Sequence, residues 1–158
     1  MLQQVPPLRA CLLVRVGLRL IPALAVLAVG GVLAGTVQDQ ERRSVWTGVY
    51  STEQAKRAEE IYAQACAACH GPMLDGGEMA PPLVGSTFNA NWNGMTLGDL
   101  MERTRTAMPQ NNPGSLSRQQ YADILALMLA TGKFPAGQAE LPRDTELLKL
   151  ITFEASKP

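Results

Sequence analysis

Apolar residues recur at the spacing of an amphipathic helix in two stretches of this chain. The first stretch spans about 52–65 and the second about 115–130, and a serine or threonine that can cap a helix stands at the start of each. The apolar stripes consist of Ala58, Ile61, Tyr62 and Ala65 in the first stretch, and of Tyr121, Ile124, Leu125, Met128 and Leu129 in the second. Each stretch is therefore expected to form a helix with one buried face.

The remainder of the chain is less regular. Residues 71–92 are rich in glycine and proline, which predicts an irregular loop. A short helix is expected over about 96–106, and a weaker helical stretch near 145–152. Because no run is rich in strand-forming residues and 158 residues make about one domain, the pattern predicts a single, mostly helical domain.

The N-terminal 34 residues have the pattern of an export signal. They hold three arginines and no acid, and the apolar stretch from about Leu20 to Leu33 carries no charge. Val32 and Ala34 are small enough for a signal peptidase, so we expect cleavage after Ala34 and export to the periplasm. The alternative is an uncleaved membrane anchor, although the stretch is shorter than the roughly 20 residues that span a bilayer.

These features divide the chain into a signal peptide or anchor at 1–34, a tether at 35–51, a helical domain at 52–135 and a C-terminal extension at 136–158. The extension either binds a partner or folds back on its own domain. The sequence has 14 basic and 14 acidic side chains, and three of the basic ones lie in the signal, so the remainder is mildly acidic. No basic run indicates nucleic-acid binding.

The chain has three cysteines, and Cys11 would be lost with the signal. Cys66 and Cys69 remain, separated by two alanines and followed at once by His70. Cys-x-x-Cys-His is the attachment motif of c-type haem. The two thiols add across the vinyl groups on one haem edge, and the adjoining imidazole binds the iron. We therefore expect one covalent haem c and its iron.

Three other interpretations of the cysteine pair are weaker. A disulfide across so short a loop would stabilise little. A thioredoxin-like redox pair needs a βαβ context, which the helical surroundings do not offer. A structural zinc site needs four ligands, and the chain holds no second Cys/His pair.

His70 is the only histidine in the chain, so the sixth iron ligand is a methionine, a lysine, a weak side chain, water or nothing. Among the seven methionines, Met108 stands in a loop stiffened by Pro109 and Pro113, and it is our first choice. Met95 is the second. A His/Met pair raises the reduction potential and fills both axial positions, which favours electron transfer over catalysis.

In this order the features resemble class I c-type cytochromes over about 52–134. The resemblance rests on the haem motif, a Pro81-x-Leu83-x-Gly85 loop, Met108-Pro109 and the final amphipathic helix. It implies an all-α domain wrapped around one covalent haem, and first and last helices that cross near Tyr62 and Tyr121. It further implies that the Pro81 carbonyl accepts a hydrogen bond from His70, that Leu83 packs on the haem, and that Trp92 lies near a propionate, unless Trp92 is a plain core residue.

Two further segments, Trp46–Tyr50 and Gly114–Ala122, look like bacterial cytochromes associated with pyrroloquinoline-quinone alcohol dehydrogenases. This closer resemblance implies a monohaem, non-enzymatic electron carrier with a redox partner such as a quinoprotein dehydrogenase or a terminal oxidase. Membrane contact is expected only if segment 1–34 is uncleaved. One alternative is a permanent haem subunit of a dehydrogenase or oxidase, and the other is a catalytic or sensory haem protein with an open iron site.

Overall fold

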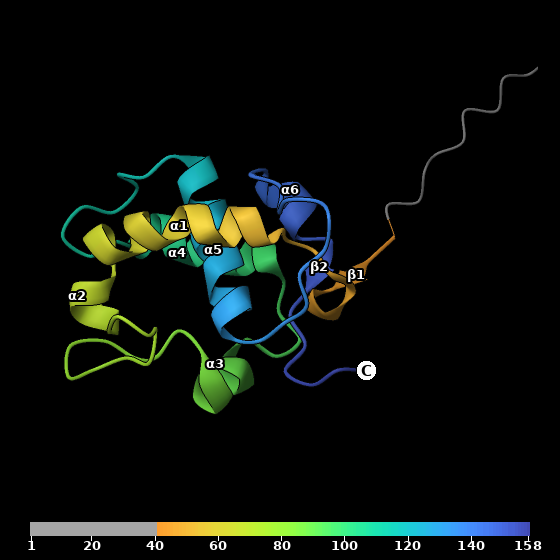
Figure 1. Cartoon of the computed structure of the whole chain (residues 1–158), viewed down its shortest axis with the longest axis horizontal. Helices are drawn as coiled ribbons and strands as arrows, with labels where there is room; N and C mark the ends of the chain where they lie inside the picture. Colours follow the sequence, from red (N-terminus) through yellow and green to blue (C-terminus); the bar gives the residue numbers. More distant parts are fainter. Residues whose placement is uncertain (1–40) are drawn as a thin grey trace, which may run out of the picture. The chain divides into compact units, whose positions relative to one another are not determined.

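The computed structural model describes residues 41–158, so the expected signal and the first part of the expected tether lie outside the described residues. The helices are α1 (Thr52–Ala65), α2 (Ala67–His70), α3 (Gly85–Trp92), α4 (Leu97–Ala107), α5 (Arg118–Thr131) and α6 (Thr145–Leu148), with a 3-10 turn at Val45–Thr47 (Figure 1). Two short strands, β1 (Arg43–Ser44) and β2 (Ile151–Thr152), pair in parallel. The predicted all-α fold is confirmed. Within residues 41–158, no helix is long and apolar enough to span a membrane.

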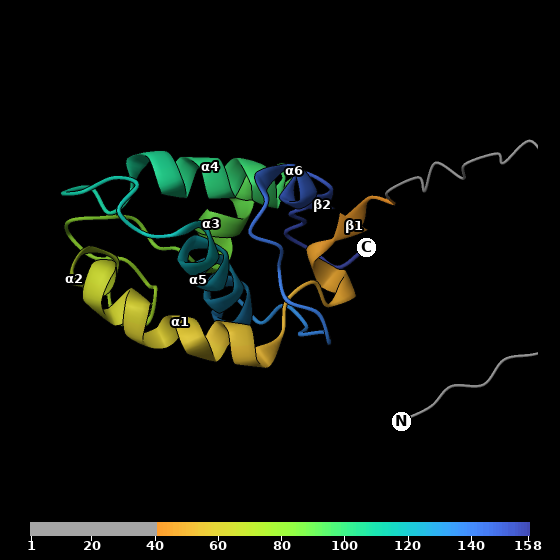
Figure 2. The same ribbon diagram turned by 90° about the horizontal axis from the view of Figure 1, so that it is seen from above.

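The two predicted amphipathic helices form as expected and pack against each other. The Ser51 hydroxyl accepts a hydrogen bond from the Gln54 amide at the start of α1, and Ser117 and Gln120 cap the start of α5 reciprocally. These bonds satisfy backbone groups that a helix end otherwise leaves unpaired. In Figure 2, α5 lies between α1 on one side and α4 on the other, so α5 is the centre of the domain.

A buried polar network joins α1 to α5. Gln54 donates to the Asp123 carboxylate at 3.2 Å and to the Leu141 carbonyl at 3.1 Å, and its own oxygen accepts from the Leu141 amide at 2.7 Å. Arg57 makes two hydrogen bonds to Asp123, at 2.8 and 2.9 Å, and two more to Glu140. One cluster therefore fixes the helix crossing and holds the C-terminal extension against it. The hydroxyls of Tyr62 and Tyr121, the two tyrosines expected near the crossing, donate to the Gly71 and Met108 carbonyls.

The C-terminal extension folds back on its own domain. Leu141, Leu148 and Phe153 are buried, and α6 packs on α4. The approach is so close that a Cβ on Gly98 would lie 2.9 Å from the backbone of both Lys149 and Thr145. Of the two interpretations of this segment, the structure supports the second. The helical stretch expected near 145–152 ends at Leu148, and a strand follows it.

Residues 43–50 also belong to the folded domain, so the expectation of a tether reaching residue 51 is wrong for this part. Val45, Val49 and Tyr50 are buried. The Trp46 indole N–H donates to the Glu154 carbonyl at 2.9 Å, and the Tyr50 hydroxyl donates to the Phe134 carbonyl at 2.8 Å. These apolar side chains cover the returning C-terminal segment, which sequence periodicity could not place beside them.

Every phenylalanine and tryptophan of the chain joins one continuous line of ring contacts. The centroid distances are 4.7 Å for Trp46–Phe134, 5.2 Å for Phe134–Phe153, 5.7 Å for Phe153–Phe88 and 6.0 Å for Phe88–Trp92. Such tilted and edge-to-face pairs add to the energy of area burial. The line connects the N-terminal segment, the extension and α3.

The helix α3 was not predicted, because the glycines and prolines of residues 71–85 suggested that the loop continues to Trp92. Val84, Phe88 and Trp92 are spaced by four, however, and this spacing is helical. The irregular loop in fact ends where α3 begins, at Gly85.

We predict that Asp123→Asn lowers the free energy of unfolding at pH 7 by about 1–3 kcal/mol, because it removes the negative charge and one of the two oxygens that accept from Gln54 and Arg57. Burial acts to raise the pKa of Asp123, but hydrogen bonds from Arg57, Gln119 and Gln54 outweigh it and the pKa is lowered. The stabilisation is therefore complete above about pH 4 and is lost as the pH falls through the lower folded-state pKa.

Urea unfolding followed by far-ultraviolet circular dichroism at pH 7 and pH 3 measures this effect. The difference in the free energy of unfolding between Asp123→Asn and the native chain should be smaller at pH 3 than at pH 7. Glu146→Gln is the control, since the Glu146–Lys149 pair is exposed and should contribute little. Equal stability of Asp123→Asn and the native chain at pH 7 would contradict the prediction.

Candidate functional site

The haem motif forms a single tight turn at the end of α1. The helix stops at Ala65, and the Cys69 and His70 amides both bond to the Cys66 carbonyl, at 3.1 and 3.0 Å. Residues Ala67–His70 of this turn make up the short helix α2 (Figure 1). It brings two free thiols and one imidazole together, with Cys66 half-buried and Cys69 exposed.

The His70 imidazole is buried and held in one orientation. Its ring Nδ1 lies 2.8 Å from the Pro81 carbonyl oxygen, which is the contact that the family resemblance implies. A neutral imidazole that donates from Nδ1 keeps the lone pair of Nε2 for a metal, and such an outer partner also makes the ring a stronger ligand. This geometry is compatible with His70 as a metal ligand.

The loop after the motif is tied to it by short-range bonds. The Gly76 amide donates to the His70 carbonyl at 2.8 Å, and the Tyr62 hydroxyl of α1 donates to the Gly71 carbonyl at 2.7 Å. Gly71 has a φ of +76°, and a Cβ there would collide with the Asp75 side chain and the Gly76 carbonyl. Only glycine fits this turn, which leads the chain away from His70 toward Pro81.

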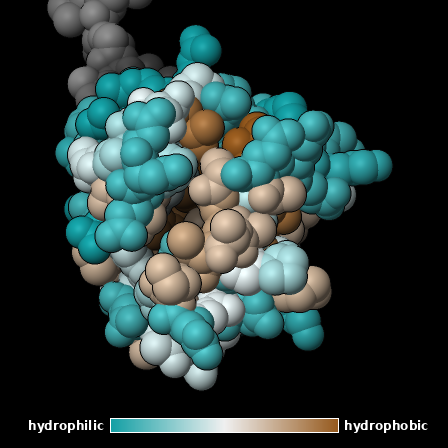
Figure 3. All heavy atoms as spheres, turned by 90° about the vertical axis from the view of Figure 1, so that its left-hand side faces the viewer, coloured by the Kyte–Doolittle hydropathy of each residue, from teal (hydrophilic) through white to brown (hydrophobic). Residues whose placement is uncertain are grey.

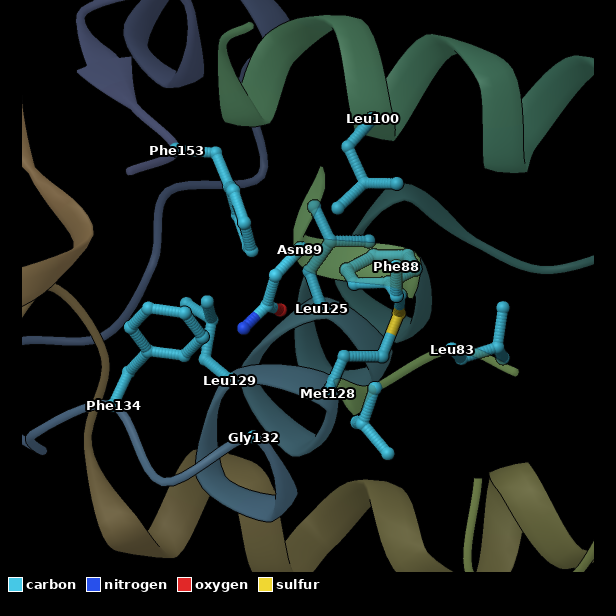
Figure 4. Close-up of a pocket in the computed structure, with 11 residues that line it drawn as sticks. Leu83, Phe88, Asn89, Leu100, Leu125, Met128, Leu129, Gly132, Phe134 and Phe153 are labelled. Carbon is cyan, nitrogen blue, oxygen red and sulfur yellow. The ribbon is translucent and has the colours of Figure 1, made fainter. Parts of the chain in front are cut away.

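A narrow apolar pocket lies between α3, α4 and α5 (Figure 4). Its lining consists of Leu83, Val84, Phe88 and Asn89, of Leu100 from α4, of Leu125, Met128, Leu129 and Gly132 at and after α5, and of Phe134 and Phe153. Leu83, expected to pack on the haem, stands two residues after Pro81 and links this pocket to His70. One face of a flat apolar group bound at the motif would meet these side chains.

One polar group interrupts the pocket lining. The Asn89 side chain reaches into the pocket, and its Oδ1 is buried without a hydrogen-bond partner (Figure 4). Such an orphaned group is costly in a finished core. An amide at the edge of an apolar slot fits a ligand that is mostly apolar and carries polar substituents, as haem does with its propionates.

Trp92 closes α3 and packs against Phe88. It is partly buried and is not among the residues that line the pocket. Its expected position beside a propionate therefore stays a prediction.

Met108 is the first residue after α4 and is half-buried. Segment 108–117 lies at the same end of the molecule as α2 in both ribbon views (Figures 1 and 2). Met95 is placed differently: it is 41% exposed, and its carbonyl accepts from the Phe153 amide beside β2, at the end of the domain remote from α2. This arrangement favours Met108 over Met95 as the second iron ligand.

The pKa of the Cys66 thiol is too high for a redox-active dithiol. Burial, with a further effect of Cys69, raises the pKa of Cys66 to about 11. Redox-active Cys-x-x-Cys pairs lower the pKa of the attacking thiol instead. The helical surroundings of the pair agree with this argument against a thioredoxin-like activity.

The surface over the motif is apolar and hollowed. Figure 3 views the side of the molecule that carries α2, and apolar residues in tan and brown surround a depression there, with hydrophilic residues around them. The loop on this side contributes Met73 and Met79, which are 67% and 79% exposed. An exposed apolar surface of this kind marks a place where a ligand or a partner binds.

Sequence reasoning missed part of the site. Phe88 and Asn89 lie on the unpredicted helix, and Phe134 and Phe153 come from the segment after α5. The spacing of Val84, Phe88 and Trp92 was the available signal for α3. No sequence signal identified Phe153, because its position depends on the way the C-terminal segment returns.

Residues 53–128 match the family model described as "Cytochrome C oxidase, cbb3-type, subunit III". The match begins in α1 and ends within α5, so it includes the haem motif, the pocket residue Leu100 and Met108. No curated protein and no solved structure shows a significant match to the chain. The residues at the motif and pocket fit a covalently attached haem.

We predict that Cys66→Ala/Cys69→Ala loses the covalent haem and folds poorly, since the haem would supply much of the apolar core on this side. Haem staining of a denaturing gel reports attachment, and thermal unfolding followed by circular dichroism reports folding. Ser86→Ala, a change on the exposed surface of α3, is the control and should retain both properties. Cooperative, native-like unfolding of the double variant would contradict the prediction.

Proposed function

Because residues 53–128 form a c-type cytochrome domain that carries haem c, we propose that this chain is a monohaem electron carrier with His70 and Met108 as the two axial iron ligands. Cys66 and Cys69 hold the haem covalently, and Leu83 packs against it. The bound group supplies an iron that cycles between the ferric and ferrous states. The observation that carries the assignment of His70 is the Nδ1 contact with the Pro81 carbonyl, which leaves Nε2 for the iron.

The protein's own contribution is to hold both ligands and to exclude water. His70 is 7% exposed, and its orientation is held by Pro81. A thioether as second ligand favours ferrous iron and leaves no open coordination position. His70 is also the only histidine in the chain, so no second imidazole is available to assist peroxide chemistry. These features favour outer-sphere electron transfer over a catalytic or sensory role.

The partner is a redox protein met outside the cytoplasm. The export pattern of residues 1–34 supports a periplasmic location, and the resemblance of Trp46–Tyr50 and Gly114–Ala122 supports a quinoprotein dehydrogenase as donor. The description of the matching family names an oxidase subunit, so a terminal oxidase is the other candidate. A permanent subunit role is less favoured, because residues 136–158 pack on their own domain. Co-purification at a fixed stoichiometry would overturn this preference.

The surface beside Cys69 is the expected docking face. Exposed Met73 and Met79 offer apolar contact area, and Asp75 and Glu78 lie exposed between them in sequence. Residues 59–80 carry four acidic side chains and neither lysine nor arginine. Since docking charges are complementary, we expect the partner's contact surface to be basic.

We predict that Met108→Ala opens the sixth coordination position and Met95→Ala does not. The reduced native protein should show a low-spin c-type spectrum that carbon monoxide leaves unchanged. Reduced Met108→Ala should become high-spin, bind carbon monoxide and have a lower reduction potential, because the thioether is gone. If Met95→Ala gives these changes and Met108→Ala does not, the ligand assignment is wrong.

We also predict that Asp75→Lys/Glu78→Lys changes electron exchange with charged small reagents in opposite directions. Oxidation by ferricyanide should become several-fold faster at low ionic strength, and reduction by hexaammineruthenium(II) several-fold slower, with both effects screened by salt. Glu41→Lys/Glu53→Lys makes the same charge change at the other end of the domain and is the control. Equal effects of the two double variants would show that this face is not where electrons leave.

A further inference from the structure

All three tyrosines of the chain are buried, and each donates its hydroxyl to a backbone carbonyl. The acceptors are Phe134 for Tyr50, at 2.8 Å, Gly71 for Tyr62, at 2.7 Å, and Met108 for Tyr121, at 2.7 Å. Two of these acceptors therefore adjoin or belong to the proposed axial ligands, and the third lies elsewhere in the core.

The bond from Tyr121 reaches the residue proposed as the sixth ligand. Tyr121 stands in the first turn of α5 and is 1% exposed, so its ring is fixed by the core. Met108 has an extended backbone just beyond α4, where its amide donates to the Thr104 carbonyl at 2.9 Å. The Met108 backbone is thus held on one side by α4 and on the other by α5.

The loop beyond Met108 has weaker attachments. Its Asn112 amide bonds to the Pro109 carbonyl and its Ser115 amide to the Asn112 carbonyl, both within the loop. The Gly114 amide reaches the Met108 carbonyl at 3.4 Å, a long contact beside the 2.7 Å bond from Tyr121. These internal bonds give the loop a shape but do not tie it to a helix. The Tyr121 hydroxyl ties the start of the loop, at Met108, to α5.

We propose that Tyr121 is the positioning residue of the sixth iron ligand: its hydroxyl holds the Met108 carbonyl so that the thioether stays within reach of the iron. This inference rests on the proposed function, since it takes Met108 as the ligand. Removing the hydroxyl releases the Met108 backbone from α5. The ligated arrangement then loses one hydrogen bond relative to arrangements in which the loop has moved and the sulfur has left the iron.

Tyr121→Phe tests the proposal with minimal change in packing, because the ring remains. A single hydrogen bond is equivalent to roughly a 2- to 12-fold change in an equilibrium. The apparent affinity of the reduced protein for carbon monoxide is proportional to the fraction in which the sixth position is open, so it should rise by that factor. The reduction potential should fall, and the weak far-red sulfur-to-iron band of the oxidised protein should fade at lower pH or temperature than in the native chain.

Tyr50→Phe is the matched control. It removes a hydroxyl of similar burial and bond length that donates to the Phe134 carbonyl and bonds to neither ligand segment. Both variants should lose comparable stability toward urea, but only Tyr121→Phe should change carbon monoxide affinity and potential. Amide hydrogen exchange of residues 108–117 should quicken in Tyr121→Phe alone.

The possible outcomes distinguish a failure of this inference from a failure of the proposed function on which it rests. If Met108→Ala opens the iron while Tyr121→Phe and Tyr50→Phe behave alike, Tyr121 has only a structural role and the inference is overturned, with Met108 still the ligand. If the native protein binds carbon monoxide freely and Met108→Ala changes nothing, Met108 is not the ligand and both proposals are overturned.

Discussion

The crossing of α1 and α5 determines where both halves of the haem site lie. The helix α1 ends at Ala65, directly before the turn that carries Cys66, Cys69 and His70. From the other side, α5 contributes a wall of the apolar pocket and bonds to the Met108 segment through Tyr121. The buried bonds from Gln54 and Arg57 to Asp123 fix the two helices at their contact. A shift at the crossing would therefore move the attachment turn and the opposite wall relative to each other.

Residues outside the family match complete this arrangement. The match ends at residue 128, yet Phe134 and Phe153 line the pocket, and Phe153 contacts both Phe134 and Phe88. Residues 43–50 cover the returning segment from outside, through the strand pairing of Arg43 with Ile151 and the bond from Trp46 to Glu154. A small helical domain buries a limited share of its surface. Both flanking segments extend the core, and Phe134 and Phe153 complete the pocket lining beyond the matched region.

The sequence allowed prediction of those parts whose cause is local. The caps of α1 and α5, the extent of α4 and the tight attachment motif depend on residues within a few positions of each other, and the structure has them where the pattern indicated. The bond from His70 to Pro81 followed from a family resemblance. The packing of Val45 and Phe153 could not be predicted, since it depends on two segments about 100 residues apart. The helix α3 was hidden by the glycines before it, although its four-residue spacing was visible.

The two sides of the site differ in how the chain secures them, and this difference bears on function. The His70 side is tied by short-range bonds: His70 to Pro81, Gly76 to His70, and Tyr62 to Gly71. The Met108 side has one bond into α4 and one to α5, and the loop that follows is bonded mainly to itself. The proposed fifth ligand is thus secured within the attachment turn, whereas the proposed sixth ligand is secured by long-range contact between two helices. An electron carrier and an open-site haem protein differ in whether a sixth ligand is held at the iron. The packing of α4 against α5 therefore sets which of the two chemistries this fold supports.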